Sequence, residues 1–240
     1  MNYNDYELEN LTAEQQLSMS RAFPVLMRKV YVWMTLALVI TGITAYGVAN
    51  SPGILHVILN SPGVFWGLII AELVLVVGIS GAIKRLSLAM ATLMFVLYSV
   101  VNGATLSFIF LVYTTSSVYS VFFITAGTFA AMALLGYVTK TDLSFMGKIL
   151  FMALIGLIIA TLVNVFFVKS TGMDLIISYV GVLVFVGLTA WDSQKIKMLL
   201  QEAPDAGEGA QKVALLGALT LYLDFVNLFI YMLRIFGRKD

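Results

Sequence analysis

The stretch GALTLYLDFVNLFIYMLRIFG, residues 217–237, decides the fold of this chain. As a helix it is long and apolar enough to cross a bilayer, whose hydrocarbon core is about 30 Å thick. Asp224 in its middle does not fit a helix surrounded by lipid, because an ionised carboxylate at that depth costs about 2.5 to 3.5 kcal/mol on insertion scales. The remainder of the chain must therefore supply protein neighbours that shield Asp224 from lipid.

The rest of the chain is apolar enough to supply those neighbours. Of 240 residues, 60% are hydrophobic and 11% are charged, and the mean hydropathy is +0.97. The apolar runs are continuous instead of alternating, which favours helices over a membrane β-barrel. We predict an all-α integral membrane protein, a seven-transmembrane-helix bundle in the lipid bilayer, with spans at Tyr31–Ala49, Val64–Ile83, Leu86–Tyr113, Val118–Val138, Gly147–Val168, Leu175–Ile196 and Val213–Phe236.

The N-terminal segment differs from the rest. Residues 1–20 are polar, carry four acids and lack the apolar run of a signal peptide, so we predict a disordered or surface-lying arm. Residues 21–240 form the predicted transmembrane domain.

The residue inventory excludes most enzyme classes. There is no cysteine, and His56 is the single histidine, which we place in a surface loop; a zinc site is therefore not expected. No lysine lies in the middle of a span, which excludes a Ser–Lys catalytic pair and a retinal Schiff base. The net charge is +1 and the basic residues are dispersed, so nucleic acid is not an expected partner. We predict neither an enzyme nor a resident cofactor.

The distribution of basic residues predicts a cytoplasmic N-terminus under the positive-inside rule. Alternate connections hold most of them: Arg21, Arg28 and Lys29 before the first span, Lys84 and Arg85 after the second, Lys140 and Lys148 after the fourth, and Lys195, Lys197 and Lys212 after the sixth. Arg234, Arg238 and Lys239 conflict with this pattern, since seven crossings put the C-terminus outside. We favour a full seventh crossing over a span that does not fully cross.

Three acids lie inside apolar spans, namely Glu72, Asp192 and Asp224, whereas most others are in loops, such as Asp142, which is placed to cap the fifth span. Counted from the cytoplasmic ends of their spans, Asp224 lies about 16 to 18 Å deep and Asp192 about 6 to 12 Å. Helix tilt of about 20° can close that gap. A carboxyl pair between the sixth and seventh spans is therefore feasible.

Such a pair would respond to pH. Two carboxylates at close range in a low dielectric cannot both stay ionised cheaply, so one would hold a proton and bond the two helices. When both groups are deprotonated, the two carboxylates repel each other and can bind a cation. Asn227 lies three residues after Asp224 and shares its helix face, which is a candidate polar lining. The alternatives are a permanent structural clamp at Asp224, pairing of Asp192 with Lys195, and an Arg234 that snorkels to the interface. For Glu72 the alternative is a structural ion pair, with Arg234 as a candidate partner.

Three stretches resemble the Bax inhibitor-1 family, also called the transmembrane Bax inhibitor motif family. Residues 219–237, LTLYLDFVNLFIYMLRIFG, resemble its C-terminal signature, AWDSQKI at 190–196 is similar to the end of its sixth helix, and KTDLSFMGKIL resembles its loop into the fifth. The resemblance implies a central last helix wrapped by the other six, and a pH-sensitive calcium leak across the membrane.

The resemblance also implies roles for single residues. The family's paired aspartates fall on Asp192 and Asp224, as pH sensor and candidate calcium contacts; its second-helix acid falls on Glu72 and its last-helix arginine on Arg234, which with Asn227 would belong to the ion pathway. The family's arginine that locks the sixth-helix aspartate corresponds to Lys84 or Arg85, and we favour Arg85.

Two other functions use the same residues. A proton-coupled cation transporter or exchanger would need the same buried carboxyls, and a non-conducting regulator would bind other membrane proteins. For a bacterial chain, the plasma (inner) membrane is the expected location.

Overall fold

The computed structural model describes residues 13–239, and these residues form helices and no β-sheet. The helices are α2 (Ala13–Ala49), α3 (Pro52–Asn60), α4 (Pro62–Ala82), α5 (Leu88–Leu106), α6 (Ile109–Val112), α7 (Thr115–Val138), α8 (Ser144–Val163) with a π-helical turn at Asn164–Val168, α9 (Thr171–Gln201) and α10 (Glu208–Phe236). Within this part of the chain, seven helical segments are long and apolar enough to cross a membrane. The predicted fold class is confirmed.

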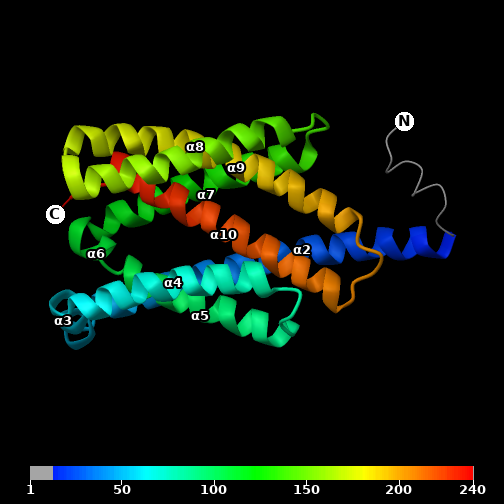
Figure 1. Cartoon of the computed structure of the whole chain (residues 1–240), viewed down its shortest axis with the longest axis horizontal. Helices are drawn as coiled ribbons and strands as arrows, with labels where there is room; N and C mark the ends of the chain where they lie inside the picture. The colour runs from blue at the N-terminus through cyan, green and yellow to red at the C-terminus, as the bar shows by residue number, and fades with distance from the viewer. Residues whose placement is uncertain (1–12, 240) are drawn as a thin grey trace.

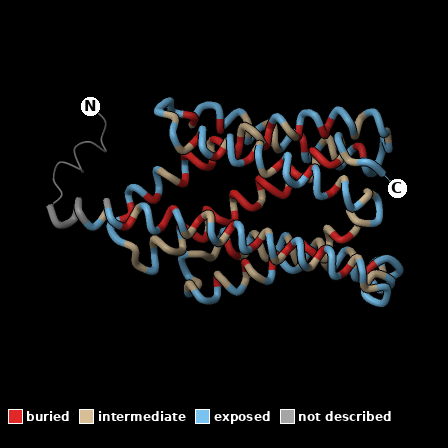
Figure 2. Tube along the Cα trace, turned by 180° about the vertical axis from the view of Figure 1, so that it is seen from behind, coloured by how far each residue is buried: buried red, intermediate tan, exposed pale blue. Residues whose placement is uncertain are grey.

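The last helix, α10, occupies the centre of the bundle. Figure 1 shows it running between α7, α8 and α9 on one side and α4 and α5 on the other. It packs mainly on α2, α5, α7 and α9, whereas α4 packs on α5 and α8 on α9. In the most apolar window of α10, 61% of residues are buried, compared with 6% for α4. Burial follows the path of α10 in Figure 2, so the predicted central C-terminal helix is confirmed.

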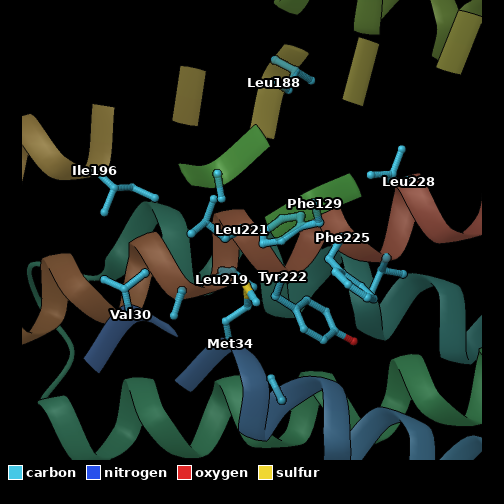
Figure 3. Packing of buried hydrophobic residues seen from close by; sticks show 14 of the residues in the cluster. Val30, Met34, Phe129, Leu188, Ile196, Leu219, Leu221, Tyr222, Phe225 and Leu228 are labelled. Carbon is cyan, nitrogen blue, oxygen red and sulfur yellow. The ribbon is translucent and has the colours of Figure 1, made fainter. Parts of the chain in front are cut away.

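The core is built on α10. Leu219, Leu221, Tyr222 and Leu228 are almost completely buried, and Figure 3 shows them pointing into contacts with neighbouring helices. Because α10 has protein neighbours around its circumference, its polar residues avoid lipid. This arrangement keeps Asp224 away from lipid, as expected for a carboxyl group in the middle of a span.

The bundle has two distinct ends. The start of α2 and the end of α10 lie at opposite ends of the molecule in Figure 1, which agrees with a full seventh crossing. α10 has 29 residues, or about 43 Å of helix, which exceeds the thickness of the hydrocarbon core.

Two segments differ from the predicted layout. α2 begins at Ala13, so residues 13–20 of the predicted arm continue the first helix, and residues 1–12 lie outside the described part of the chain. The predicted loop around His56 is helix α3. Pro52 and Pro62 stand in the first turns of α3 and α4, where a proline's missing N–H has no helical partner to lose. His56 is exposed, as the loop prediction expected.

Candidate functional site

Asp192 of α9 and Asp224 of α10 form a buried carboxyl pair. Their residues are 7% and 5% exposed, and their side chains lie within hydrogen-bonding reach of each other. The Oδ2 atom of Asp224 is buried and has no hydrogen-bond partner. A hydrogen bond between two carboxyl groups requires a proton on one of them, so this geometry suits a pair that shares one proton.

Both helices that carry the pair are longer than the sequence predicted. α9 continues to Gln201, past the predicted end at Ile196, and α10 begins at Glu208, before the predicted start at Val213. At 1.5 Å per residue, Asp192 lies about 13 Å from the end of α9 and Asp224 about 24 Å from the start of α10. The difference counted along the chain therefore remains, and the packing of α9 against α10 brings the two carboxyl groups together.

The residues after Asp192 fasten α9 to α7 and its following loop. Ser193 Oγ donates to the carbonyl of Ala133 at 2.8 Å, and Lys197 Nζ donates to that of Tyr137 at 2.8 Å. Gln194 accepts from Leu143 N–H and donates to Thr141 O, both at 2.8 Å. These bonds fix the rotation of α9 about its axis, which turns Asp192 toward α10.

The cation that acts on Asp192 is Lys195, one turn along the same helix. Its Nζ also lies 4.9 Å from the ring centroid of Trp191. Arg85, the residue expected to lock the pair, is exposed in the turn after α4, and no ion pair joins it to either aspartate among the described residues. The reason is the layering of the bundle, since α5 lies between α4 and α10.

Glu72 lies in a second polar cluster, away from the carboxyl pair. Its side chain is within hydrogen-bonding reach of Thr105 and Asn102 on α5, and its Oε1 is buried without a partner. Tyr222 of α10 donates to Asn102 Oδ1 at 2.8 Å, and its hydroxyl lies 2.7 Å from Thr41 Oγ1 of α2. The cluster thus connects α4, α5, α10 and α2.

Arg234 pairs with Asp174, an acid at the start of α9 that is not among the predicted site residues. Arg234 Nη1 lies 3.0 Å from Asp174 Oδ1, in the first turn of α9. The sequence contained a pattern that predicts this pair. An acid in the first turn of one helix and a base in the last turn of its antiparallel neighbour lie at the same end of the bundle. Glu72 is therefore not the ion partner of Arg234 in this structure.

The asparagines of the spans do not gather at the carboxyl pair. Asn227 donates to the carbonyl of Leu223 on its own helix at 2.8 Å. Asn164 bonds the backbone of Ser170 and closes the connection between α8 and α9. No group of three or more His, Cys, Asp or Glu residues that could hold a metal forms within residues 13–239.

Asp142 caps the fifth span as predicted, one position earlier than a standard N-cap. Its Oδ1 accepts from the N–H of Ser144, the first residue of α8, at 2.8 Å. Hydrogen bonds from Ser144, helped by the charge of Lys148, lower the pKa of Asp142 from its ordinary value of 3.8.

Comparison with known proteins extends over nearly the whole chain. The family described as "Inhibitor of apoptosis-promoting Bax1" matches residues 24–240. The inner membrane protein YbhL of Escherichia coli K12 is 48% identical over 214 residues, which cover 89% of this chain and 91% of YbhL.

Further relatives come from distant bacteria. A Borreliella burgdorferi protein is 43% identical over 88% of this chain and 90% of its own length. A Streptococcus pyogenes serotype M6 membrane protein is 43% identical over 78% of this chain and 80% of its own. The three names together describe bacterial proteins, two of them explicitly of membranes.

Proposed function

Because the chain belongs to the Bax inhibitor-1 family of multi-pass membrane proteins, we propose that it is a pH-sensitive calcium leak channel whose protonation latch is the carboxyl pair Asp192 and Asp224. One observation carries the proposal: two carboxyl groups from neighbouring spans lie within hydrogen-bonding reach of each other inside the bundle, and one oxygen of Asp224 is unpartnered. A structure that needed only rigidity would be better served by an apolar pair.

In the closed state the two carboxyls share one proton. We place this proton on Asp224, because Lys195 lies three residues from Asp192 on the same face of α9 and its positive charge would stabilise a carboxylate there. Loss of that proton leaves two adjacent negative charges, whose repulsion is about 4 kcal/mol at 4 Å and an effective dielectric constant of 20. The helices α9 and α10 are pushed apart, and the open state gains population as the pH rises.

Calcium would contact the deprotonated pair only in passing. Ca²⁺ takes 6 to 8 oxygen ligands, and two carboxyls supply fewer. Weak coordination suits a leak, since an ion that binds must also leave. Asn227 and Arg234, which follow Asp224 along α10, would line the remaining path toward the other end of the bundle. Glu72 would belong to the path only if the path crosses α10 to the cluster around Tyr222. By analogy with YbhL and the positive-inside rule, we place the protein in the inner membrane with a cytoplasmic N-terminus.

Arg85 would act as the lock only if α4 moves toward α9. Comparing Lys195→Gln with Arg85→Gln separates the two cations. A change in the pH dependence of flux in Lys195→Gln alone would assign the role to Lys195, and a change in Arg85→Gln alone would restore Arg85 as the lock.

The test is calcium flux into proteoliposomes between about pH 5 and pH 8. Wild-type flux is expected to rise with pH, and Asp192→Asn and Asp224→Asn should flatten that dependence. Asp205→Asn, which removes an exposed carboxylate from the connection between α9 and α10, is the matched control and should follow the wild type.

Other results would point elsewhere. Flux that stops when the proton gradient is collapsed would indicate a proton-coupled exchanger. An absence of calcium movement at every pH would contradict the leak and favour a regulator that binds other membrane proteins.

A further inference from the structure

A long apolar groove runs between α2 and α7, with α10 as its floor. Two cavities of about 710 and 680 Å³ form it, and Thr35, Leu38, Phe122 and Phe225 line both, so the groove is continuous. Each cavity alone falls within the roughly 300 to 1,000 Å³ of small-molecule sites.

The groove exists because α2 and α7 do not pack closely against each other in the described part of the chain. At one end Phe23 stacks on Tyr137, with ring centroids 6.4 Å apart. At the other, the short helix α6 is inserted, and Phe110 meets Tyr46 at 5.8 Å. Between these two ends the groove is lined by aromatic rings. The ring centroids of Phe225 of α10 and Phe129 of α7 lie 5.4 Å apart, and Figure 3 shows both side chains.

The mouth of the groove opens on lipid. Ile43 and Phe123, which line it, are 69% and 70% exposed on membrane-spanning helices. A ligand that enters here arrives through the hydrocarbon, so it must itself be apolar over most of its length.

One end of the groove is cationic. Arg28 lines the second cavity, is exposed, and has no ion pair among residues 13–239. Arg28 lines the cavity together with Tyr31 and lies near the start of the first membrane-spanning helix, Arg21–Ala49, so we expect it close to the headgroups of the bilayer. Basic pockets between membrane helices at this level are typical sites for anionic headgroups.

We propose that the groove between α2 and α7 binds one anionic phospholipid, with an acyl chain along the aromatic floor and the phosphate at Arg28. The occupant matches each part of the groove: an apolar body, lateral entry from the bilayer and a negative end. This site goes beyond the calcium leak and does not depend on it.

Native mass spectrometry of the full chain in detergent tests the proposal, with equimolar dioleoylphosphatidylglycerol and dioleoylphosphatidylcholine as probes. The wild type should retain one phosphatidylglycerol preferentially. Arg28→Gln should lower the ratio of the anionic to the zwitterionic lipid about fivefold, equivalent to about 1 kcal/mol. Arg21→Gln removes an exposed arginine that does not line the groove and should leave the ratio unchanged.

A second pair of variants tests the acyl-chain site. Ala130→Phe fills the groove and should reduce retention of both lipids, whereas Ala131→Phe, on the adjacent exposed position outside the groove, should not. If Ala130→Phe does not fold, Gly42→Phe replaces it, since a side chain at Gly42 meets open space.

Three results would overturn the proposal. The first is equal retention of the two lipids by the wild type, and the second is equal behaviour of Arg28→Gln and Arg21→Gln. The third is a dimer that Ala130→Phe alone dissociates, because a second copy of the chain would then be the occupant.

Discussion

Tyr222 and Asp224 make polar contacts on two opposite sides of α10. Two residues along an α-helix turn the side chain by about 200°, so the two groups point in nearly opposite directions. Asp224 meets Asp192 of α9, and Tyr222 meets Asn102 of α5 and Thr41 of α2. The polar contacts of the central helix therefore hold both halves of the bundle.

Replacing Tyr222 with Phe should destabilise the protein by about 1 to 3 kcal/mol. The change keeps the ring but leaves Asn102 Oδ1 buried without its donor. Thermal unfolding in detergent measures the loss. Tyr179→Phe is the control, because Tyr179 is 54% exposed, and its melting temperature should match the wild type. Equal melting temperatures for the two variants would show that the hydroxyl of Tyr222 does not contribute to the stability of the protein.

Asp142 should make stability depend on pH through its bond to Ser144. Because its folded pKa is lower than 3.8, its contribution is complete above the unfolded value and is lost as the pH falls through the folded value. Asp142→Ala should therefore melt below the wild type at pH 7, and the difference should vanish in acid. Asp142→Asn keeps an acceptor oxygen and should lose less. A difference between Asp142→Ala and the wild type that persists unchanged into acid would contradict this account.

At the scale of helices, the contact between α7 and α9 sets the geometry of the carboxyl pair. Gly136 of α7 lies against the carbonyl of Ala190, two residues before Asp192, and a Cβ at this position would overlap that carbonyl. Close approach of the two backbones lets Ser193 and Lys197 reach carbonyls of α7. Small residues at such contacts are typical of membrane helix pairs.

Gly136→Val should consequently separate α7 from α9 and destabilise the bundle by about 1 to 3 kcal/mol, the usual cost of overpacking. Gly127→Val is the matched control on the same helix, since its side chain would meet nothing within 4 Å. Thermal unfolding compares them. If Gly136→Val has the same melting temperature as Gly127→Val, the backbones of α7 and α9 do not pack as closely as described. In the flux assay, Gly136→Val should also raise flux at low pH, where the wild type is closed.

At the scale of the whole molecule, seven crossings separate the connections into two sets on opposite sides of the membrane. The chain contains no cysteine, so single cysteines report sidedness without further changes. The connection between α7 and α8 lies at the end of the bundle where α2 begins, whereas α3 and the end of α10 lie at the other (Figure 1). Lys140 belongs to the α7–α8 connection, Asn60 ends α3, and Lys239 follows α10, so a cysteine at each position samples one of the two sides.

A membrane-impermeant maleimide applied to intact cells should label Asn60→Cys and Lys239→Cys but not Lys140→Cys, given a cytoplasmic N-terminus. Lysed cells, in which all three should react, provide the control. Labelling of Lys140→Cys alone would invert the orientation, and labelling of Asn60→Cys without Lys239→Cys would mean that α10 does not fully cross.

The fold class follows from the amino-acid sequence alone, as do the seven spans and the three acids that lie inside them. These properties are local: an apolar run of about 20 residues must satisfy its own backbone in lipid and so becomes a helix, whatever its neighbours are. The family signature in the last span also follows from consecutive residues, and the match over residues 24–240 confirmed it.

The contacts between polar groups, by contrast, follow from how the helices pack. Asp192 reaches Asp224 because α9 packs against α10 and is fixed in rotation by Ser193, Gln194 and Lys197. Glu72 contacts Asn102 of α5, and Arg85 stays exposed, because α5 separates α4 from α10. Arg234 pairs with Asp174 because the end of α10 lies beside the start of α9. Such contacts depend on how helices rotate and pack against one another, and hydropathy along the chain carries no information about either.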